Sequence, residues 1–145
     1  NALIGEERRL LANFKQLFTV LTGNAAQKYG AKLDTHQQIL LALADIFIEI
    51  YFTESSILRT LKNCNRSGEE SQKSQITMTK IYLYEATDII AKKAKEVIVN
   101  MCKDEEQKQL LEVLHKKLQY HEYPDIIGLK TEVADKLIEE NNYCF

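Results

Sequence analysis

The chain has 145 residues, of which 45% are hydrophobic and 28% charged, and its formal net charge is −2. This length fits one domain that buries roughly 70% of the surface of its unfolded chain. The charge gives no electrostatic reason to expect nucleic acid or an anionic membrane as a partner. Only five glycines and one proline interrupt the chain. So few helix breakers favour long helices over a turn-rich β fold.

The first predicted helix shows apolar residues at steps of three and four, which places them on one helical face. This stripe consists of Leu10, Phe14, Leu17, Leu21 and Ala25. Gly30 is a typical stop signal, so the helix is predicted from Glu6 to Tyr29. Asp34, with Gln37 three residues later, resembles a capping box and predicts a second helix from about Thr35 to Asn63.

The segment Asn63–Gly68 contains asparagine, serine and glycine, and it predicts the next turn. A third helix is predicted from about Glu69 to Met101. Its apolar stripe consists of Leu83, Ala86, Ile90, Ala94, Val97 and Met101.

Asp104 with Gln107 repeats the capping pattern and predicts a fourth helix. The apolar stripe of that helix consists of Leu110, Leu111, Leu114 and Leu118. The segment Tyr123–Asp125 then breaks the chain, because proline removes a donor and disfavours helix before it. A fifth helix follows and ends near Asn141. These patterns predict an all-α fold, an antiparallel bundle of about five helices that forms a single domain over residues 1–145.

The predicted second helix is apolar around most of its circumference. One stripe consists of Leu40, Leu43, Phe47, Ile50, Ile57 and Leu61, and a second, adjacent stripe of Leu41, Ala44, Ile48, Tyr51 and Leu58. A helix with two apolar stripes is normally central and touches neighbours on more than one side. What remains is a narrow polar edge formed by Gln38, Asp45, Glu49, Thr53 and Thr60.

Asp45 and Glu49 lie one helical turn apart on that edge. Like charges at this spacing repel by a few tenths of a kcal/mol unless a cation comes between them. Charged helix faces are usually solvated, which favours a wet edge, or an edge facing a basic partner surface, over catalysis. Glu54 instead continues the line of the first apolar stripe, so we expect it to be partly buried beside a cation or hydrogen-bond donor. The candidate partners are Arg8, Arg9 and Arg59.

Other chemical signals are few. A di-iron site in a bundle uses two Glu-x-x-His motifs, whereas this chain has one, Glu112 to His115. Cys64, Cys102 and Cys144 are odd in number and widely spaced, which predicts free thiols in a reducing cytoplasm. There is no glycine-rich phosphate loop. We therefore predict no catalytic, cofactor-binding or metal-binding residue. The polar residues left as candidate interface or structural groups are Asp45, Glu49, Glu54 and Arg59.

One segment resembles a known family. Leu43–Tyr51 reads LADIFIEIY and is followed by Glu54-Ser55, Leu58-Arg59 and Lys62. It resembles the C-terminal extension of acyl-CoA dehydrogenases of the very-long-chain type. The stretch Gln75–Ile90 and the ending Glu140–Phe145 resemble bacterial, Bacteroidetes-type members. The chain also begins without methionine, and we expect it to be a fragment of a longer protein.

The resemblance implies a parent flavoprotein that oxidises acyl-CoA to enoyl-CoA in fatty-acid β-oxidation, with FAD taking the hydride and a glutamate removing the α-proton. It places both in a catalytic core upstream of Asn1, so neither Glu49 nor Glu54 is expected to be that base. It also implies that this domain packs on the core and shapes the oligomeric state. Exposed apolar area on a detached piece would favour homo-oligomers. The alternatives are a stand-alone helical-bundle module that binds another protein and a small bundle enzyme with an unrecognised site.

Overall fold

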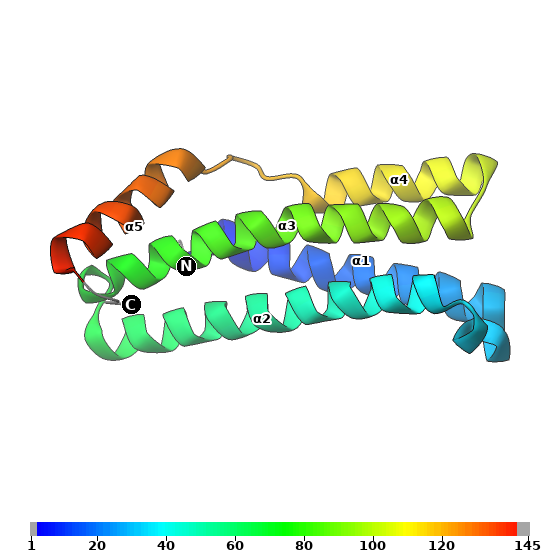
Figure 1. Ribbon diagram of the computed structural model, residues 1–145, viewed down its shortest axis with the longest axis horizontal. Helices are drawn as coiled ribbons and strands as arrows, with labels where there is room; N and C mark the ends of the chain where they lie inside the picture. Colours follow the sequence, from blue (N-terminus) through cyan, green and yellow to red (C-terminus); the bar gives the residue numbers. More distant parts are fainter. Residues whose placement is uncertain (1–2, 142–145) are drawn as a thin grey trace.

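The computed structural model describes residues 3–141 as five long helices and two short 3₁₀ helices, and this part of the chain contains no strand. The predicted all-α fold is confirmed (Figure 1). The helices are α1 (Gly5–Tyr29), α2 (Gln37–Ser67), α3 (Lys73–Met101), α4 (Asp104–Leu118) and α5 (Ile126–Glu140). The 3₁₀ helices η1 (Gly30–Thr35) and η2 (Glu70–Gln72) precede α2 and α3.

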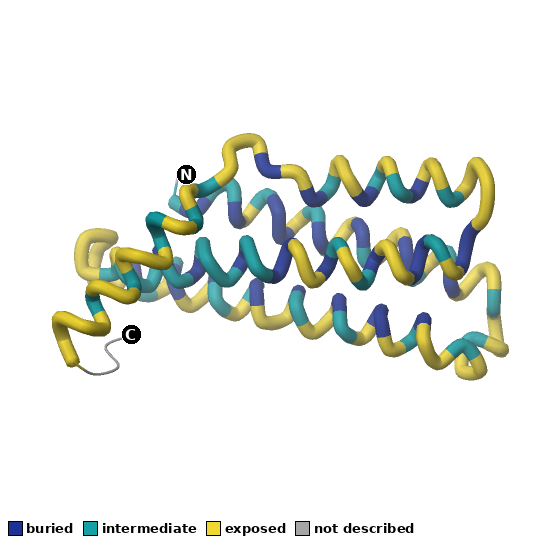
Figure 2. The backbone as a smooth tube through the Cα atoms, turned by 45° about the horizontal axis from the view of Figure 1, so that its top comes forward, coloured by how far each residue is buried: buried dark blue, intermediate teal, exposed yellow. Residues whose placement is uncertain are grey.

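Helices α1 to α4 run alternately up and down, so that each is antiparallel to the next (Figure 1). Helices α2 and α4 each pack against both α1 and α3, and they lie on opposite sides of that central pair. Helix α5 turns away from the bundle and packs against α3 (Figure 1). Buried residues face the middle of the four-helix part, and α5 contains none (Figure 2).

The core lies along the central pair of helices. All five residues of the predicted α1 stripe have no exposed surface, and every residue of the predicted α3 stripe is buried. Fully burying one such leucine or phenylalanine stabilises the fold by about 1.5–3 kcal/mol. Because isolated helices are marginal in water, this shared burial is the main source of helix stability.

The helix starts differ from the capping predictions. Asp34 does not cap α2: residues 30–35 wind into η1, and α2 begins after His36 with no side-chain cap. The Gln37 side chain instead donates to the backbone carbonyl of Asp34 at 2.5 Å. Likewise α4 has no side-chain cap, and Gln107 donates to the carbonyl of Cys102 at 2.9 Å. In both cases the glutamine satisfies a carbonyl of the preceding turn, which the capping-box pattern does not anticipate.

The turn predicted at Asn63–Gly68 begins later than expected, because α2 continues to Ser67. It ends at Gly68, whose φ of 86° is a conformation that residues with a Cβ rarely adopt. Gly30 ends α1 as predicted, also with positive φ, at 53°.

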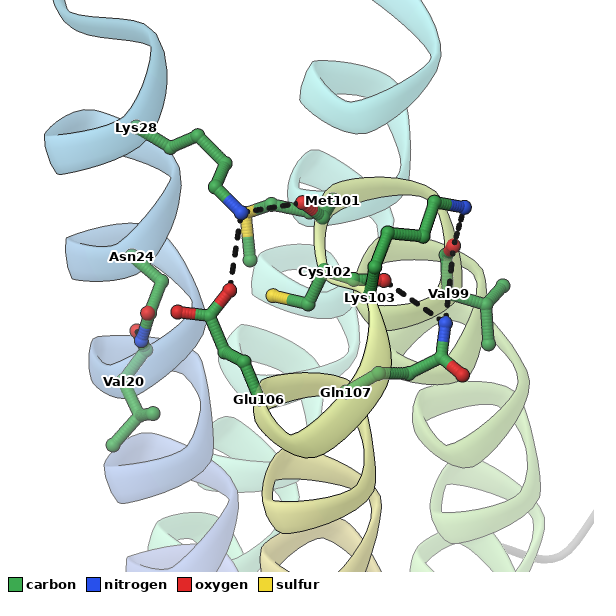
Figure 3. Close-up of polar contacts among 9 residues, drawn as sticks. All are labelled: Val20, Asn24, Lys28, Val99, Met101, Cys102, Lys103, Glu106 and Gln107. Atoms are coloured by element: carbon green, nitrogen blue, oxygen red, sulfur yellow. Dashed lines mark hydrogen bonds and ion pairs between the residues drawn. The ribbon is translucent and has the colours of Figure 1, made fainter.

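The turn between α3 and α4 is held by Lys28 of α1. Its Nζ donates to the carbonyl of Met101 at 2.8 Å and to Oε1 of Glu106 at 3.0 Å (Figure 3). The hydrogen bond with Glu106 raises the pKa of Lys28. A cation placed at the carboxyl end of α3 also interacts favourably with the helix dipole. These contacts tie the end of α3 and the start of α4 to the end of α1.

The connector from α4 to α5 is held by Glu6 at the other end of the bundle. Its carboxylate accepts hydrogen bonds from the backbone N–H of His121 at 2.8 Å and of Glu122 at 3.2 Å. Arg9 donates to the same carboxylate at 2.6 Å and to the carbonyl of Gln119 at 2.9 Å. Partial burial opposes ionisation of Glu6, but these bonds outweigh it and lower its pKa. The first turn of α1 therefore positions the connector.

We expect the core to be far more sensitive to truncation than α5. Leu17→Ala removes a side chain with no exposed surface and should lower the free energy of unfolding by about 2–5 kcal/mol. Ile138→Ala truncates a side chain that is 76% exposed and should change it by less than about 0.5 kcal/mol. Urea denaturation followed by circular dichroism measures both. Equal destabilisation by the two variants would contradict this assignment of the core.

Candidate functional site

Both carboxylates of the predicted polar edge face α3. Asp45 lies 3.4 Å from Nζ of Lys93, and Glu49 accepts a hydrogen bond from the hydroxyl of Tyr82 at 3.1 Å. The Lys93 cation offsets the repulsion between the two carboxylates. The Asp45 side chain is 47% exposed, so this ion pair is worth no more than about 0–1 kcal/mol. The arrangement stabilises contact between two helices and contains no nucleophile or base poised over a cavity.

Glu54 is half-buried, as expected, but its partner is none of the three predicted arginines. It forms an ion pair with Lys15 of α1. Arg9 is held by Glu6, and Arg59 is exposed with no hydrogen bond or ion pair to any of residues 3–141. The prediction of an arginine was wrong because the partner is set by the register of α1 against α2, which sequence spacing does not reveal.

The two threonines assigned to the polar edge are buried. Thr53 and Thr60 are each only 1% exposed, and the hydroxyl of Thr60 lies 2.7 Å from that of Thr79 on α3. The Thr60 and Thr79 hydroxyls can be buried at little cost, because each keeps the other as a hydrogen-bond partner, whereas the buried hydroxyl of Thr53 has no partner among the described residues. The polar edge is therefore narrower than predicted and is occupied by Gln38, Asp45 and Glu49.

The second apolar stripe of α2 faces away from the bundle. Leu41, Ala44, Ile48, Tyr51 and Leu58 are all exposed, so the prediction of a central helix is wrong within the described chain. Helices α1 and α3 cover only the opposite side of α2, which lies at the edge of the bundle (Figure 1). Six large side chains of α2 are 46–61% exposed, and together we call them the outer face of α2: Leu41, Phe47, Ile48, Tyr51, Phe52 and Leu58.

The remaining chemical candidates are not brought together. Residues 3–141 contain no group of three or more His, Cys, Asp or Glu side chains that could hold a metal ion. His115 lines an open cavity of about 320 Å³ between α3 and α4, together with Tyr84, Lys95 and Tyr120. Cys64 and Cys102 are free and buried, and burial raises the pKa of both thiols. Cys144 lies outside the described residues.

None of the helices within residues 3–141 has the length and apolar character needed to cross a membrane. The described chain is thus a helical bundle whose most distinctive surface is an apolar helix face rather than a catalytic pocket.

Comparison with known proteins gives the family. Residues 13–116 match the family described as acyl-CoA dehydrogenase, C-terminal domain, and the chain belongs to that family. A probable acyl-CoA dehydrogenase of Bacillus subtilis (strain 168) is 31% identical over 143 residues, which is 99% of this chain. The crystal structure of an acyl-CoA dehydrogenase complexed with FAD from Bacillus anthracis superposes over the whole chain with a TM-score of 0.94 at 32% identity.

The chain spans about a quarter of the length of these relatives, 24% of the first and 25% of the second. The resemblance noted in the sequence is therefore confirmed at the level of the family. The ending Glu140–Phe145, which also carried that resemblance, lies mostly outside the described residues.

We expect Glu49 to contribute to the raised pKa of Tyr82. Burial is the main cause, and the charge of Glu49 adds to it, so that the pKa of Tyr82 is raised to about 12 from its ordinary value of 10.0. Glu49→Gln should lower this pKa while burial keeps it above 10.0. Ultraviolet titration of tyrosinate, as the difference between proteins with and without Tyr82→Phe, isolates this residue.

The same shift predicts how stability depends on pH. Because the pKa of Tyr82 is higher in the folded protein, its contribution to the free energy of unfolding is complete below pH 10 and is lost as the pH rises toward 12.

For the tyrosinate titration, Glu112→Gln, at an exposed carboxylate on α4, is the control and should leave the pKa of Tyr82 unchanged. An unchanged pKa of Tyr82 in Glu49→Gln would show that the contact is absent.

Proposed function

We propose that this chain is the non-catalytic C-terminal helical domain of a longer, FAD-dependent acyl-CoA dehydrogenase. In this proposal residues 1–145 form one domain that packs on the catalytic core and shapes the oligomeric state. The parent enzyme oxidises acyl-CoA to enoyl-CoA in fatty-acid β-oxidation. The observation that carries it is the match of residues 13–116 to the C-terminal domain family, in a chain one quarter the length of its relatives.

We propose further that the parent is of the very-long-chain type and comes from a Bacteroidetes-type bacterium. Support comes from the segments Leu43–Tyr51 and Gln75–Ile90, whose residues resemble that group. Free, buried Cys64 and Cys102 support a reducing compartment, and we propose the cytoplasm.

The residues present do not fit FAD itself. A pyrophosphate is held by backbone N–H groups at a glycine-rich loop or helix N-terminus. The cavity between α3 and α4 has one carboxylate, Asp88, beside Lys95 and His115, and it contains no glycine. A second cavity of about 410 Å³ is lined by four carboxylates, Glu6, Glu7, Glu122 and Asp125, against one cation, Lys80, and this excess would repel the ligand's negative charge. We therefore propose that flavin, acyl-CoA and the catalytic base belong to the part of the parent protein outside residues 1–145.

Asp45, Glu49, Glu54 and Arg59 are proposed to be structural or interface residues rather than catalytic ones. Support for the first three comes from their contacts with Lys93, Tyr82 and Lys15, which lie within the bundle. Arg59 is exposed at the end of the outer face of α2, where it would meet the catalytic core.

Charge reversal tests these roles. In the full-length protein, Asp45→Lys with Glu49→Lys places like charges beside Lys93 and removes the acceptor of Tyr82. The free energy of unfolding should fall by about 1–2 kcal/mol. Glu112→Lys with Glu132→Lys makes the same change in net charge at exposed positions in the middle of α4 and of α5, away from the helix ends, and serves as the control. Unchanged stability, oligomeric state and activity in the first variant would sink the structural assignment.

The parent enzyme is tested by sequencing the gene upstream of the codon for Asn1 and purifying its full-length product. We expect a yellow protein whose flavin absorption is bleached by acyl-CoA, with long acyl chains reacting best. Residues 1–145 expressed alone should be colourless and inactive. A start codon directly before Asn1 would favour the stand-alone interaction module, and flavin bound by residues 1–145 alone would overturn their non-catalytic role.

A further inference from the structure

The outer face of α2 is the largest feature of the bundle that the contacts within the chain leave unused. Its six side chains recur along residues 41–58, about 26 Å of helix at 1.5 Å per residue. Three of them, Phe47, Tyr51 and Phe52, are aromatic, and rings of this kind are enriched at the centres of protein interfaces. Contiguous apolar patches on a rigid element mark interaction sites.

The charges beside this face are turned away from it. Asp45 and Glu49 are engaged by α3, and Glu54 is engaged by Lys15 of α1. The charged residues on the two sides of the outer face therefore stabilise the bundle. The outer face between them carries no charged residue from Leu41 to Leu58. Charged residues are depleted at interface cores, so the composition suits burial against another surface.

The size of the face distinguishes between possible occupants. With large side chains presenting about 150–250 Å² each, exposures of 46–61% leave roughly 600 Å² in total. A partner surface of the same size would bring the total buried area to roughly 1,200 Å², which is the lower limit for separate proteins, since these bury about 1,200–2,000 Å² in total. Domains of one chain share about 600–1,500 Å² in total, and a linker raises the effective concentration to the order of millimolar. The face is therefore suited to an attached domain.

The relatives contain further chain that could form such a domain, because this chain spans only a quarter of their length. We infer that the outer face of α2 docks on the part of the full-length protein outside residues 1–145. This inference deepens the proposed function and rests on it. Phe47 marks the side of the face nearest α1, because its ring centroid lies 5.8 Å from that of Phe18. Leu58 marks the far end of the face.

Thiol accessibility in the full-length protein tests this docking. Single variants Ile48→Cys and Leu58→Cys place a thiol on the outer face, and Gln109→Cys places one on the exposed side of α4. Maleimide labelling is followed by mass spectrometry of the labelled peptide, and each rate is divided by that of the same thiol in denatured protein. We expect labelling at positions 48 and 58 to be at least tenfold slower than at position 109. Equal rates would overturn the inference.

The identity of the occupant is read by photo-crosslinking from benzoylphenylalanine introduced at position 51 of the full-length protein. A cross-linked peptide outside residues 1–145 supports the inference. A cross-link only to residues 1–145 of a second, isotope-labelled copy would show that the face joins two such domains, and no cross-link would show that it is free. These readouts do not depend on flavin. A protein without flavin would therefore refute the proposed function, whereas freely labelled thiols in a flavoprotein would refute only the docking surface.

Discussion

The mutual burial of α1 and α3 is the constraint on which the rest of the structure depends. Their stripes, centred on Phe14 in α1 and Ile90 in α3, are buried along their whole length and define the middle of the bundle. Helices α2 and α4 can then pack only on the two sides of this pair, as Figure 1 shows. The polar anchors at the two ends, Lys28 and Glu6, follow from the same placement, because each reaches from α1 to a turn beside α4.

This placement decides what α2 can do. A helix packed on one side of a central pair buries only part of its apolar surface. The second stripe of α2 therefore remains exposed, and with Phe47 of the first stripe and Phe52 it forms the outer face. Of the charged residues beside this face, Glu54 forms an ion pair with α1 and Asp45 forms one with α3. The chain thus combines a well-packed interior with an outward apolar surface, a combination typical of a domain whose neighbour is elsewhere in a larger protein.

The chemistry is consistent with that view. The chain belongs to the C-terminal domain family of acyl-CoA dehydrogenases. The carboxylates of Asp45, Glu49, Glu54 and Glu6 contact groups of the bundle itself. Burial, together with Glu49, raises the pKa of Tyr82, and Glu6 accepts hydrogen bonds from the connector between α4 and α5. Perturbed ionisation at such positions reflects packing and hydrogen bonding, and it does not by itself indicate catalysis.

Much of this was available from the sequence. Periodicity and the scarcity of glycine and proline predicted five helices, the glycine stop at Gly30 and the complete α1 and α3 stripes. These features are local, because the spacing of apolar residues determines which face of a helix is buried. The capping predictions at Asp34 and Asp104 failed, because residues 30–35 form η1 and because Gln37 and Gln107 donate to backbone carbonyls of the preceding turn. Only the tertiary structure decided that Lys15 pairs with Glu54 and that the second stripe of α2 is left outside. Both depend on the register and number of neighbouring helices, which are set by contacts between residues distant in the chain.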